Sequence, residues 1–427
     1  MKMRALMTLL LAAVLAVACN DPLPVREPSQ EKYSRVLIYV GDGYNTICNY
    51  IADDIKDIVG APNNALLPAE GSNKALIIIS HLPKVKGDWA TPTEPIITRV
   101  SRDYAGRPVC DTLMRMPSGT IMTKSENFRT ALEFVRDNFP ADSYGMILSS
   151  HGSGWLPAGY LNGDRHGTTL CAAGQAPEGA VRYVERPAPY GIDLKTFGQE
   201  LKSIDGVIWS YEMTLPSLAA SLPFNLDYMI IDACLMGCVE TAYELRGKVR
   251  HLCISPAEIL GDGFDYATIL SRLLVETPAN VKGVCEDYYN MYESKTGVSQ
   301  SATITMVDCS KMDHLAECCH ELFSKYRSQI ANVEGGDVQG FFRENMHWFY
   351  DLKDILVKAG ITYEEQEELT AALDECMVYR AHTKQFMNDF EIKTYCGFSM
   401  YLPSDGDNYL NSYYTELEWN KATGLVE

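Results

Sequence analysis

The sequence predicts an α/β protein with a mostly parallel sheet that is flanked by helices on both faces. Short apolar runs alternate with segments of helical periodicity through the first 308 residues, which is the pattern of strand–helix–strand units. Because these runs are continuously apolar, we expect strands that are buried on both faces, as in a parallel sheet. From Cys309 onward the periodicity becomes mostly helical, so a helix-rich C-terminal portion should follow.

The expected elements follow one another along the chain. Buried strands are predicted over 36–40, 75–80, 145–151, 226–233, 251–255 and 301–307. Helices are predicted between them over 125–138, 238–245, 265–274 and 280–293. After residue 309 we expect helices over 312–330, 339–358 and 363–380, and one late strand over 397–403.

The composition is that of a globular protein. Of its 427 residues, 46% are hydrophobic and 22% are charged, which excludes disorder for most of the chain and allows a sizeable core. The formal net charge is −19, with no basic cluster that could neutralise phosphates. We therefore expect no nucleic-acid partner.

The N-terminus reads as an export signal rather than as part of the fold. Lys2 and Arg4 precede an apolar run that is too short for a spanning helix, and small residues stand directly before Cys19. This resembles a bacterial lipobox, so we predict a lipoprotein signal peptide over 1–18, lipidation of Cys19 and a tether over 19–34. Asn20 is not the aspartate that retains lipoproteins in the inner membrane, which favours the outer membrane or cell surface.

Metal sites and disulfide frameworks have no signature in this chain. The twelve cysteines after Cys19 are scattered and form no CxxC pair. Cys318-Cys319-His320-Glu321 lies within a helical pattern, where neighbouring side chains point in different directions. We expect no cofactor and no metal site, and the sequence leaves a response to calcium open.

Two segments carry reactive side chains at the ends of predicted strands. The run 146–150 ends in His151-Gly152, and the run 228–233 ends in Cys234. In open parallel sheets, ligands bind beyond the carboxyl ends of the strands, so both side chains should reach one edge. A histidine or a cysteine alone would most often be structural, but the two together predict a thiol nucleophile with an imidazole partner.

The clostripain family of cysteine peptidases has motifs that this sequence resembles. His151-Gly152-Ser153-Gly154-Trp155 is similar to its HGxGW motif, and Asp232-Ala233-Cys234-Leu235-Met236 to its DACLM motif. Further similarity lies in 255–258, 261–264 and the late strand, and extends unevenly from about residue 35 to 403. The opening strand departs from the family, with Gly41-Asp42-Gly43-Tyr44-Asn45 in place of a DNNLE-like run.

The resemblance implies a caspase-like fold, a Cys234–His151 dyad and cleavage of protein or peptide substrates after arginine or lysine. The change of periodicity at Cys309 divides the chain into a caspase-like catalytic domain at 35–308 and a helix-rich region at 309–427. The backbone N–H groups of Gly152 and Cys234 would form the oxyanion hole.

The same sequence suggests a pocket for the basic P1 side chain. Asp232 is two residues before Cys234, so on a strand the two side chains share a face, and a carboxylate there would pair with arginine or lysine. Asp232 could instead only orient the backbone. Glu258 and Asp262 are further candidates for the pocket wall.

The stretch 152–192 is rich in glycine and proline and reads as a long surface loop. It contains Arg165, Arg182 and Arg186, and relatives are often made as zymogens that are cut within such a loop. Self-cleavage after one of these residues is therefore a hypothesis, with Arg165 preferred because it is nearest to His151. A plain solvated loop is the alternative.

Two rival functions belong to other classes. The chain could be a catalytically silent caspase-like surface lipoprotein that binds peptides or other surface components, although the presence of both His151 and Cys234 argues against it. It could also be a structural or glycan-capturing lipoprotein, a reading that fits the aromatic content but has no motif behind it.

Overall fold

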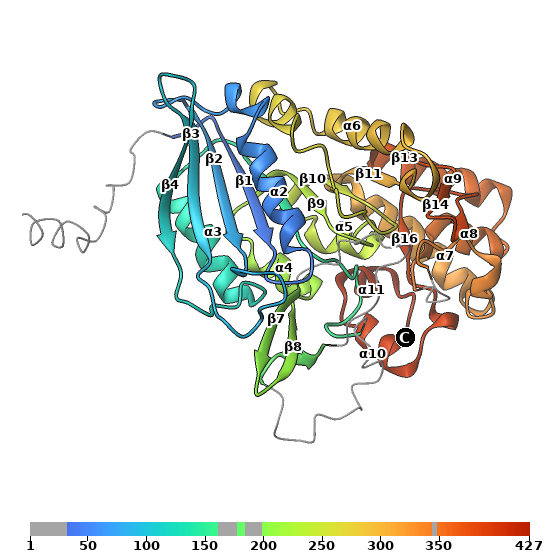
Figure 1. The fold of residues 1–427 in the computed structure, drawn as a ribbon. Helices are drawn as coiled ribbons and strands as arrows, with labels where there is room; N and C mark the ends of the chain where they lie inside the picture. Colours follow the sequence, from blue (N-terminus) through green and yellow to red (C-terminus); the bar gives the residue numbers. More distant parts are fainter. Residues whose placement is uncertain (1–31, 161–176, 184–198, 344–347) are drawn as a thin grey trace, which may run out of the picture.

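The computed structural model describes residues 32–160, 177–183, 199–343 and 348–427. Within these residues, the main element is a nine-stranded sheet with the strand order β13-β11-β10-β9-β5-β1-β2-β3-β4 (Figure 1). Its centre is parallel and its two edges are antiparallel. The central strands are β1 (Arg35–Asp42), β2 (Lys74–His81), β5 (Tyr144–Ser149), β9 (Leu226–Asp232) and β10 (Val249–Ile254).

The predicted α/β class is confirmed, and the central strands lie where their apolar runs predict them. Every residue of β1 and β5 is buried, as expected for strands covered on both faces. Two edge strands, β3 (Ile96–Arg102) and β4 (Pro108–Arg115), were not predicted. They form a hairpin in which β4 is largely exposed, so its sequence lacks the apolar run that marks a buried strand.

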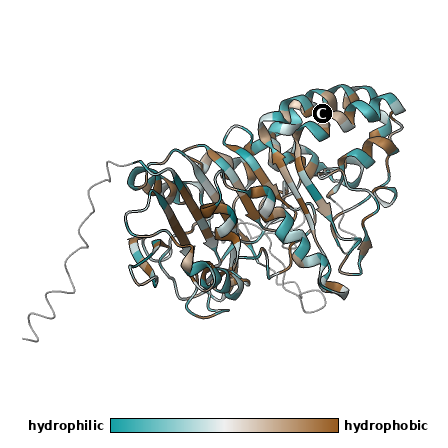
Figure 2. Ribbon diagram, turned by 90° about the horizontal axis from the view of Figure 1, so that it is seen from above, coloured by the Kyte–Doolittle hydropathy of each residue, from teal (hydrophilic) through white to brown (hydrophobic). Residues whose placement is uncertain are grey.

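Helices cover both faces of the sheet (Figure 1). On one face, Tyr39 of β1 donates a hydrogen bond of 3.3 Å to Asp54 of α2 (Cys48–Val59). On the other face, Val40 lines a cavity together with Phe128 of α3 (Ser125–Asn138) and Leu218 of α4 (Leu215–Ser221). The helix α5 (Val239–Leu245) packs against α4, and α6 (Val281–Glu293) packs against the antiparallel edge. Figure 2 shows hydrophobic strands at the centre and hydrophilic helix surfaces outside.

The C-terminal region returns to the central sheet. Its strand β13 (Met377–His382) pairs with β11 (Thr303–Asp308) and forms one edge. The helices of this region are α7 (Met312–Ile330), α8 (Leu352–Lys358), α9 (Tyr363–Cys376), α10 (Asn408–Tyr414) and α11 (Glu418–Thr423).

Four of the predicted elements differ in the structure. The helix expected over 363–380 ends at Cys376, because the following residues pair with β11 as β13. Of the helix expected over 339–358, the described residues form only α8, and Tyr350–Asp351 (β12) instead pairs with Ser399–Met400 (β16); residues 344–347 lie outside the described part of the chain. The late strand predicted over 397–403 is therefore short and lies outside the central sheet. The helix expected over 265–274 forms only in its second half, because 266–268 form a turn, 269–270 are helical and Ser271–Val275 form a π-helical turn.

A small second sheet lies at the carboxyl edge of the main one. Its order is β6-β8-β7, with β6 (Ala180–Arg182), β7 (Gln199–Ile204) and β8 (Val207–Glu212). The strand β6 falls within the segment that was predicted to be a surface loop, of which 161–176 and 184–192 are outside the described residues. The described helices include none with the length and apolarity that a membrane crossing requires.

Candidate active site

Two neighbouring parallel strands end at the candidate site. The strands β5 and β9 pair in register as far as Ser149 and Asp232, and His151 and Cys234 each follow two residues later. Since the strands run in the same direction, the two residues leave the sheet at its carboxyl edge in equivalent positions. Adjacent strands lie about 4.8 Å apart, so this register places the segment that carries His151 beside the segment that carries Cys234.

The thiol of Cys234 is enclosed in this structure. Its residue is fully buried, and Sγ accepts a hydrogen bond of 3.1 Å from the backbone N–H of Ile259. Burial raises the pKa of Cys234 well above its usual value, and the carboxylate of Glu258 raises it further. The Ile259 N–H and the guanidinium of Arg343 act in the opposite direction. Cys234 is therefore held as a neutral thiol, shielded from solvent.

His151 is also buried, with 5% of its surface exposed. Its Nε2 shares a hydrogen bond of 2.9 Å with Oγ1 of Thr46, which lies in the loop after β1. The hydroxyl of the preceding residue, Ser150, donates to the backbone carbonyl of Asp42 at 2.8 Å. The end of β1 and the loop after it thus hold His151, which follows the neighbouring strand β5, by hydrogen bonds to His151 and to Ser150.

The residue after the nucleophile has an unusual backbone conformation. Leu235 has φ = 62°, in the left-handed region that residues other than glycine rarely adopt. Its N–H donates to the carbonyl of Ala257 at 3.0 Å, and the N–H of Gly237 donates to Ser255 at 2.7 Å. The segment after β10 therefore holds a sharp turn directly behind Cys234, as is common where strain serves a functional site.

The glycine at position 154 is required by two features. Its φ is 57°, and a Cβ there would lie 2.4 Å from Cε1 of Phe349 and 2.7 Å from the carbonyl oxygen of Leu235. Only glycine therefore allows the loop after His151 to approach the turn after Cys234. The next residue, Trp155, is fully buried against Tyr401 and anchors this loop in the C-terminal region.

The C-terminal region also contacts the segment after the nucleophile. The N–H of Ser399 donates to the carbonyl of Gly237 at 3.0 Å. The buried carboxylate of Glu240 accepts hydrogen bonds from the N–H of Tyr401 and the hydroxyl of Tyr414. Burial raises the pKa of Glu240 to about 7.

The three carboxylates predicted for the P1 pocket have different environments. Asp232 is fully buried and accepts hydrogen bonds from Ser149 at 3.2 Å and Tyr266 at 2.7 Å. Asp262 is largely exposed and pairs with Lys295 at 3.0 Å. Glu258 is buried near Cys234 and binds a guanidinium.

That guanidinium belongs to Arg343, which sequence reasoning did not single out. Its Nε and one terminal nitrogen donate to the two carboxylate oxygens of Glu258, the second at 3.0 Å, and the side chain is 8% exposed. A further ion pair of 3.6 Å joins Arg343 to Asp389. The sequence offers no signal for this arginine, because it stands in a segment that was predicted only as part of a helix over 339–358. Thr46 was missed for a similar reason, since its loop departs from the family pattern.

The remaining predicted residues lie elsewhere. Arg182 is exposed in β6, where it pairs with Trp209 of β8. Arg165, Arg186 and Cys19 lie outside the described residues.

Comparison with known proteins identifies a family that part of this chain matches. Residues 209–424 match the family model described as the clostripain family. No curated protein matches the chain.

Several solved structures share the fold. A structure titled as an inactive zymogen C11 protease from Parabacteroides distasonis has a TM-score of 0.70 and 24% identity, covering 92% of this chain and 99% of that one. A secreted C11 cysteine protease from Bacteroides thetaiotaomicron has a TM-score of 0.71 and 20% identity, covering 92% and 100%. A structure of a secreted C11 cysteine protease from Bacteroides thetaiotaomicron in complex with an irreversible peptide inhibitor has a TM-score of 0.68 and 18% identity, covering 92% of this chain and 99% of that one. At these identities the likeness shows the fold.

Proposed function

The chain belongs to the clostripain family of cysteine peptidases, and on this premise we propose that it is an endopeptidase that uses a Cys234–His151 dyad to cleave after arginine or lysine. The observation that carries the proposal is the common register of β5 and β9, from which both residues follow at the same carboxyl edge. The strained turn at Leu235 supports it, because it lies directly behind the nucleophile.

The reaction follows from these groups. The Cys234 thiol transfers its proton to His151, and the thiolate attacks the scissile carbonyl carbon. The N–H groups of Gly152 and Cys234 stabilise the resulting oxyanion, each by a few kcal/mol. His151 then protonates the leaving amine, and a thioester forms. A water molecule, deprotonated by His151, hydrolyses the thioester and restores the thiol.

Glu258 is the carboxylate best suited to select a basic P1 side chain. It already binds a guanidinium through two oxygens beside Cys234, which is the geometry that a P1 arginine would use. Asp232 already accepts hydrogen bonds from two hydroxyls, and Asp262 is exposed and paired with Lys295. Substrate arginine must therefore replace Arg343 at Glu258.

Fluorogenic peptides that differ only at P1 test both the dyad and the pocket. We expect Arg and Lys peptides to be cleaved, and Cys234→Ala and His151→Ala to abolish cleavage.

Glu258→Gln should reduce the ratio of kcat/KM for Arg over Leu peptides more than Asp232→Asn or Asp262→Asn does. Asp227→Asn, at an exposed position on β9, is the matched control. A dyad variant that keeps full activity contradicts the mechanism, and a preserved Arg preference in Glu258→Gln contradicts the pocket.

Activation would require a change in the enclosed site, because a buried neutral thiol cannot attack a substrate. We propose self-cleavage after Arg165, Arg182 or Arg186, with Arg165 preferred. Mass analysis should find two fragments for the wild type and one intact chain for Cys234→Ala. An intact wild-type chain with full activity contradicts processing. No turnover even after cleavage of the loop by an added protease would favour the catalytically silent, peptide-binding alternative.

We also propose that the protein is exported and lipid-anchored through Cys19 at the outer membrane or cell surface. Labelling with a radioactive fatty acid should mark the wild type and leave Cys19→Ala unlabelled. Recovery of both forms in the soluble extracellular fraction contradicts the anchor.

A further inference from the structure

Three buried side chains meet at the carboxyl edge of the sheet, on the face that α3 covers. Asp42 ends β1, His81 ends β2 directly beside it in the register, and Glu200 comes from β7 of the small sheet. One ligating atom from each lies within 4.8 Å of the other two. The residues are 7%, 3% and 1% exposed. Nδ1 of His81 contacts Oε1 of Glu200, and Oε2 of Glu200 accepts from the N–H of Met122 at 2.7 Å.

The negative charge of this cluster is not neutralised by an ion pair among the described residues, although Lys202 acts on Glu200 electrostatically. Among the described residues, no lysine or arginine forms an ion pair with Asp42 or Glu200, and Oδ1 of Asp42 has no hydrogen-bond partner there. Two carboxylates and an imidazole in contact, away from water, are unfavourable unless a proton or a cation joins them.

The donor set favours zinc over calcium or magnesium. One imidazole nitrogen and two carboxylate oxygens are common zinc ligands, whereas calcium takes six to eight oxygens. In a tetrahedral site with ligands at about 2.0–2.2 Å, ligand atoms are roughly 3.3–3.6 Å apart, within the span of this cluster.

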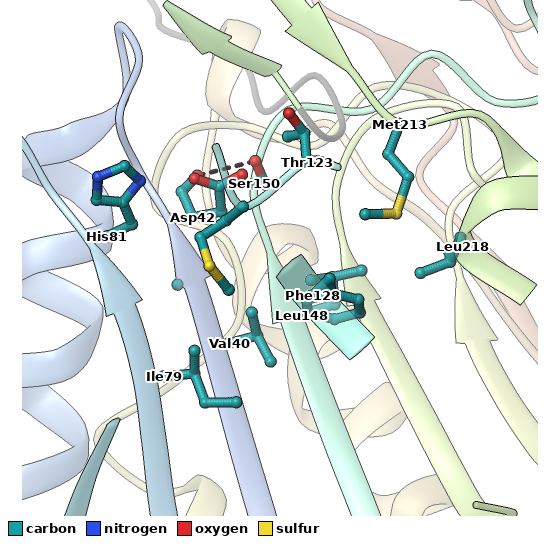
Figure 3. Close-up of a pocket in the computed structure, with 12 residues that line it drawn as sticks. Val40, Asp42, Ile79, His81, Thr123, Phe128, Leu148, Ser150, Met213 and Leu218 are labelled. Carbon is teal, nitrogen blue, oxygen red and sulfur yellow. Dashed lines mark hydrogen bonds between the residues drawn. The ribbon is translucent and has the colours of Figure 1, made fainter. Parts of the chain in front are cut away.

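A cavity of about 20 Å³ borders the cluster and has room for a water molecule as a fourth ligand. Figure 3 shows the arrangement, with Asp42, His81, Thr123 and Ser150 at the polar end and Val40 among the apolar side chains below.

We propose that Asp42, His81 and Glu200 bind one zinc ion that fastens the small sheet to the main sheet. The ion would also fix the loop after β1. Asn45 of this loop donates to the carbonyls of Asp42 and Gln199, at 3.0 and 2.8 Å, and Thr46 bonds to His151. The site is thus structural, and it does not depend on the P1 preference or on the dyad assignment.

Metal content tests the proposal directly. The protein is prepared as Cys234→Ala, so that the nucleophile thiol cannot bind metal, then stripped with a chelator, incubated with Zn²⁺ and desalted. We expect one zinc per chain and a higher melting temperature with zinc than without. His81→Gln and Asp42→Asn in this background should weaken zinc binding by more than the 10–100-fold typical of a lost outer-shell partner, and should lose the thermal shift. His314→Gln, which alters a surface His–Glu pair, is the matched control and should behave as its parent.

The ligands themselves provide a second measurement, which stands even if a variant does not fold. X-ray absorption of the zinc-loaded Cys234→Ala protein should show nitrogen and oxygen ligands without sulfur. Sulfur ligation would assign the metal to other cysteines and overturn the proposal. A chain that takes up no zinc overturns it as well, and leaves a proton shared between Asp42 and Glu200 as the explanation for their contact.

Discussion

The guanidinium of Arg343 covers both carboxylate oxygens of Glu258 in a buried ion pair beside Cys234. Removal of Arg343 leaves the buried carboxylate of Glu258 without this guanidinium. We expect Arg343→Met to lower the free energy of unfolding by about 3–5 kcal/mol. In the double variant Arg343→Met, Glu258→Leu, most of this loss should be recovered. Urea unfolding measures both, and a double variant as unstable as the sum of the single changes contradicts the coupling.

Thr46 offers a test of how His151 is oriented. Thr46→Val removes the hydroxyl that bonds to Nε2 while keeping the shape of the side chain. We expect kcat/KM of the activated enzyme to fall about fivefold, since one hydrogen bond contributes about 1 kcal/mol. Thr46→Ser keeps the hydroxyl and should restore activity. Equal activity of the valine and serine variants would rule out a positioning role.

Gly154→Ala should be severe because the position combines a positive φ with a close contact. A methyl group there meets Phe349 and the carbonyl of Leu235, so we expect a loss of at least 2 kcal/mol of stability together with loss of peptidase activity. Gly106→Ala is the matched control, since its φ is 76° and its Cβ would have open space. It should cost only about 1 kcal/mol. Similar losses for both variants would show that φ alone, without the contact, determines the effect.

Glu240 gives the protein a pH dependence of known sign. Its pKa is raised from 4.5 to about 7, so the folded state binds a proton that the unfolded state releases above pH 4.5. The contribution of Glu240 to stability is therefore complete below pH 4.5 and is lost as the pH rises to about 7, with a slope of at most about 1.4 kcal/mol per pH unit. Glu240→Gln removes this titration. Urea unfolding between pH 4.5 and 8 should give a smaller decline for the variant, and parallel curves for the two proteins would contradict it.

The sequence predicts the centre of the fold better than its edges. Continuously apolar runs specify β1, β5 and β9 because these strands are covered on both faces, and the bounds of α3 are those predicted. The change from α9 to β13 has no glycine or proline to mark it. Only pairing with β11 ends the helix at Cys376, and that pairing is a tertiary effect.

In the candidate site, too, the residues of local motifs were predicted and their distant partners were not. His151 and Cys234 were predicted because each is part of a local motif at the end of a strand. Thr46 meets His151 across 105 residues, and Arg343 meets Glu258 across 85. The cluster of Asp42, His81 and Glu200 is equally dispersed, with 119 residues between the last two. Such partners have no spacing that a single sequence could reveal, and only the packing of the sheet against its loops brings them together.

The hydrogen bond from Ser399 to Gly237 has a consequence for how this protein can vary. The late segment of the chain supplies the neighbours of the turn behind the nucleophile, so the two stretches form one mechanical unit although 162 residues separate them. Chimeras that exchange the C-terminal region between relatives should fold and work only when the stretch around residue 237 is exchanged with it. Substitutions around residue 237 must therefore be compatible with those around residue 399.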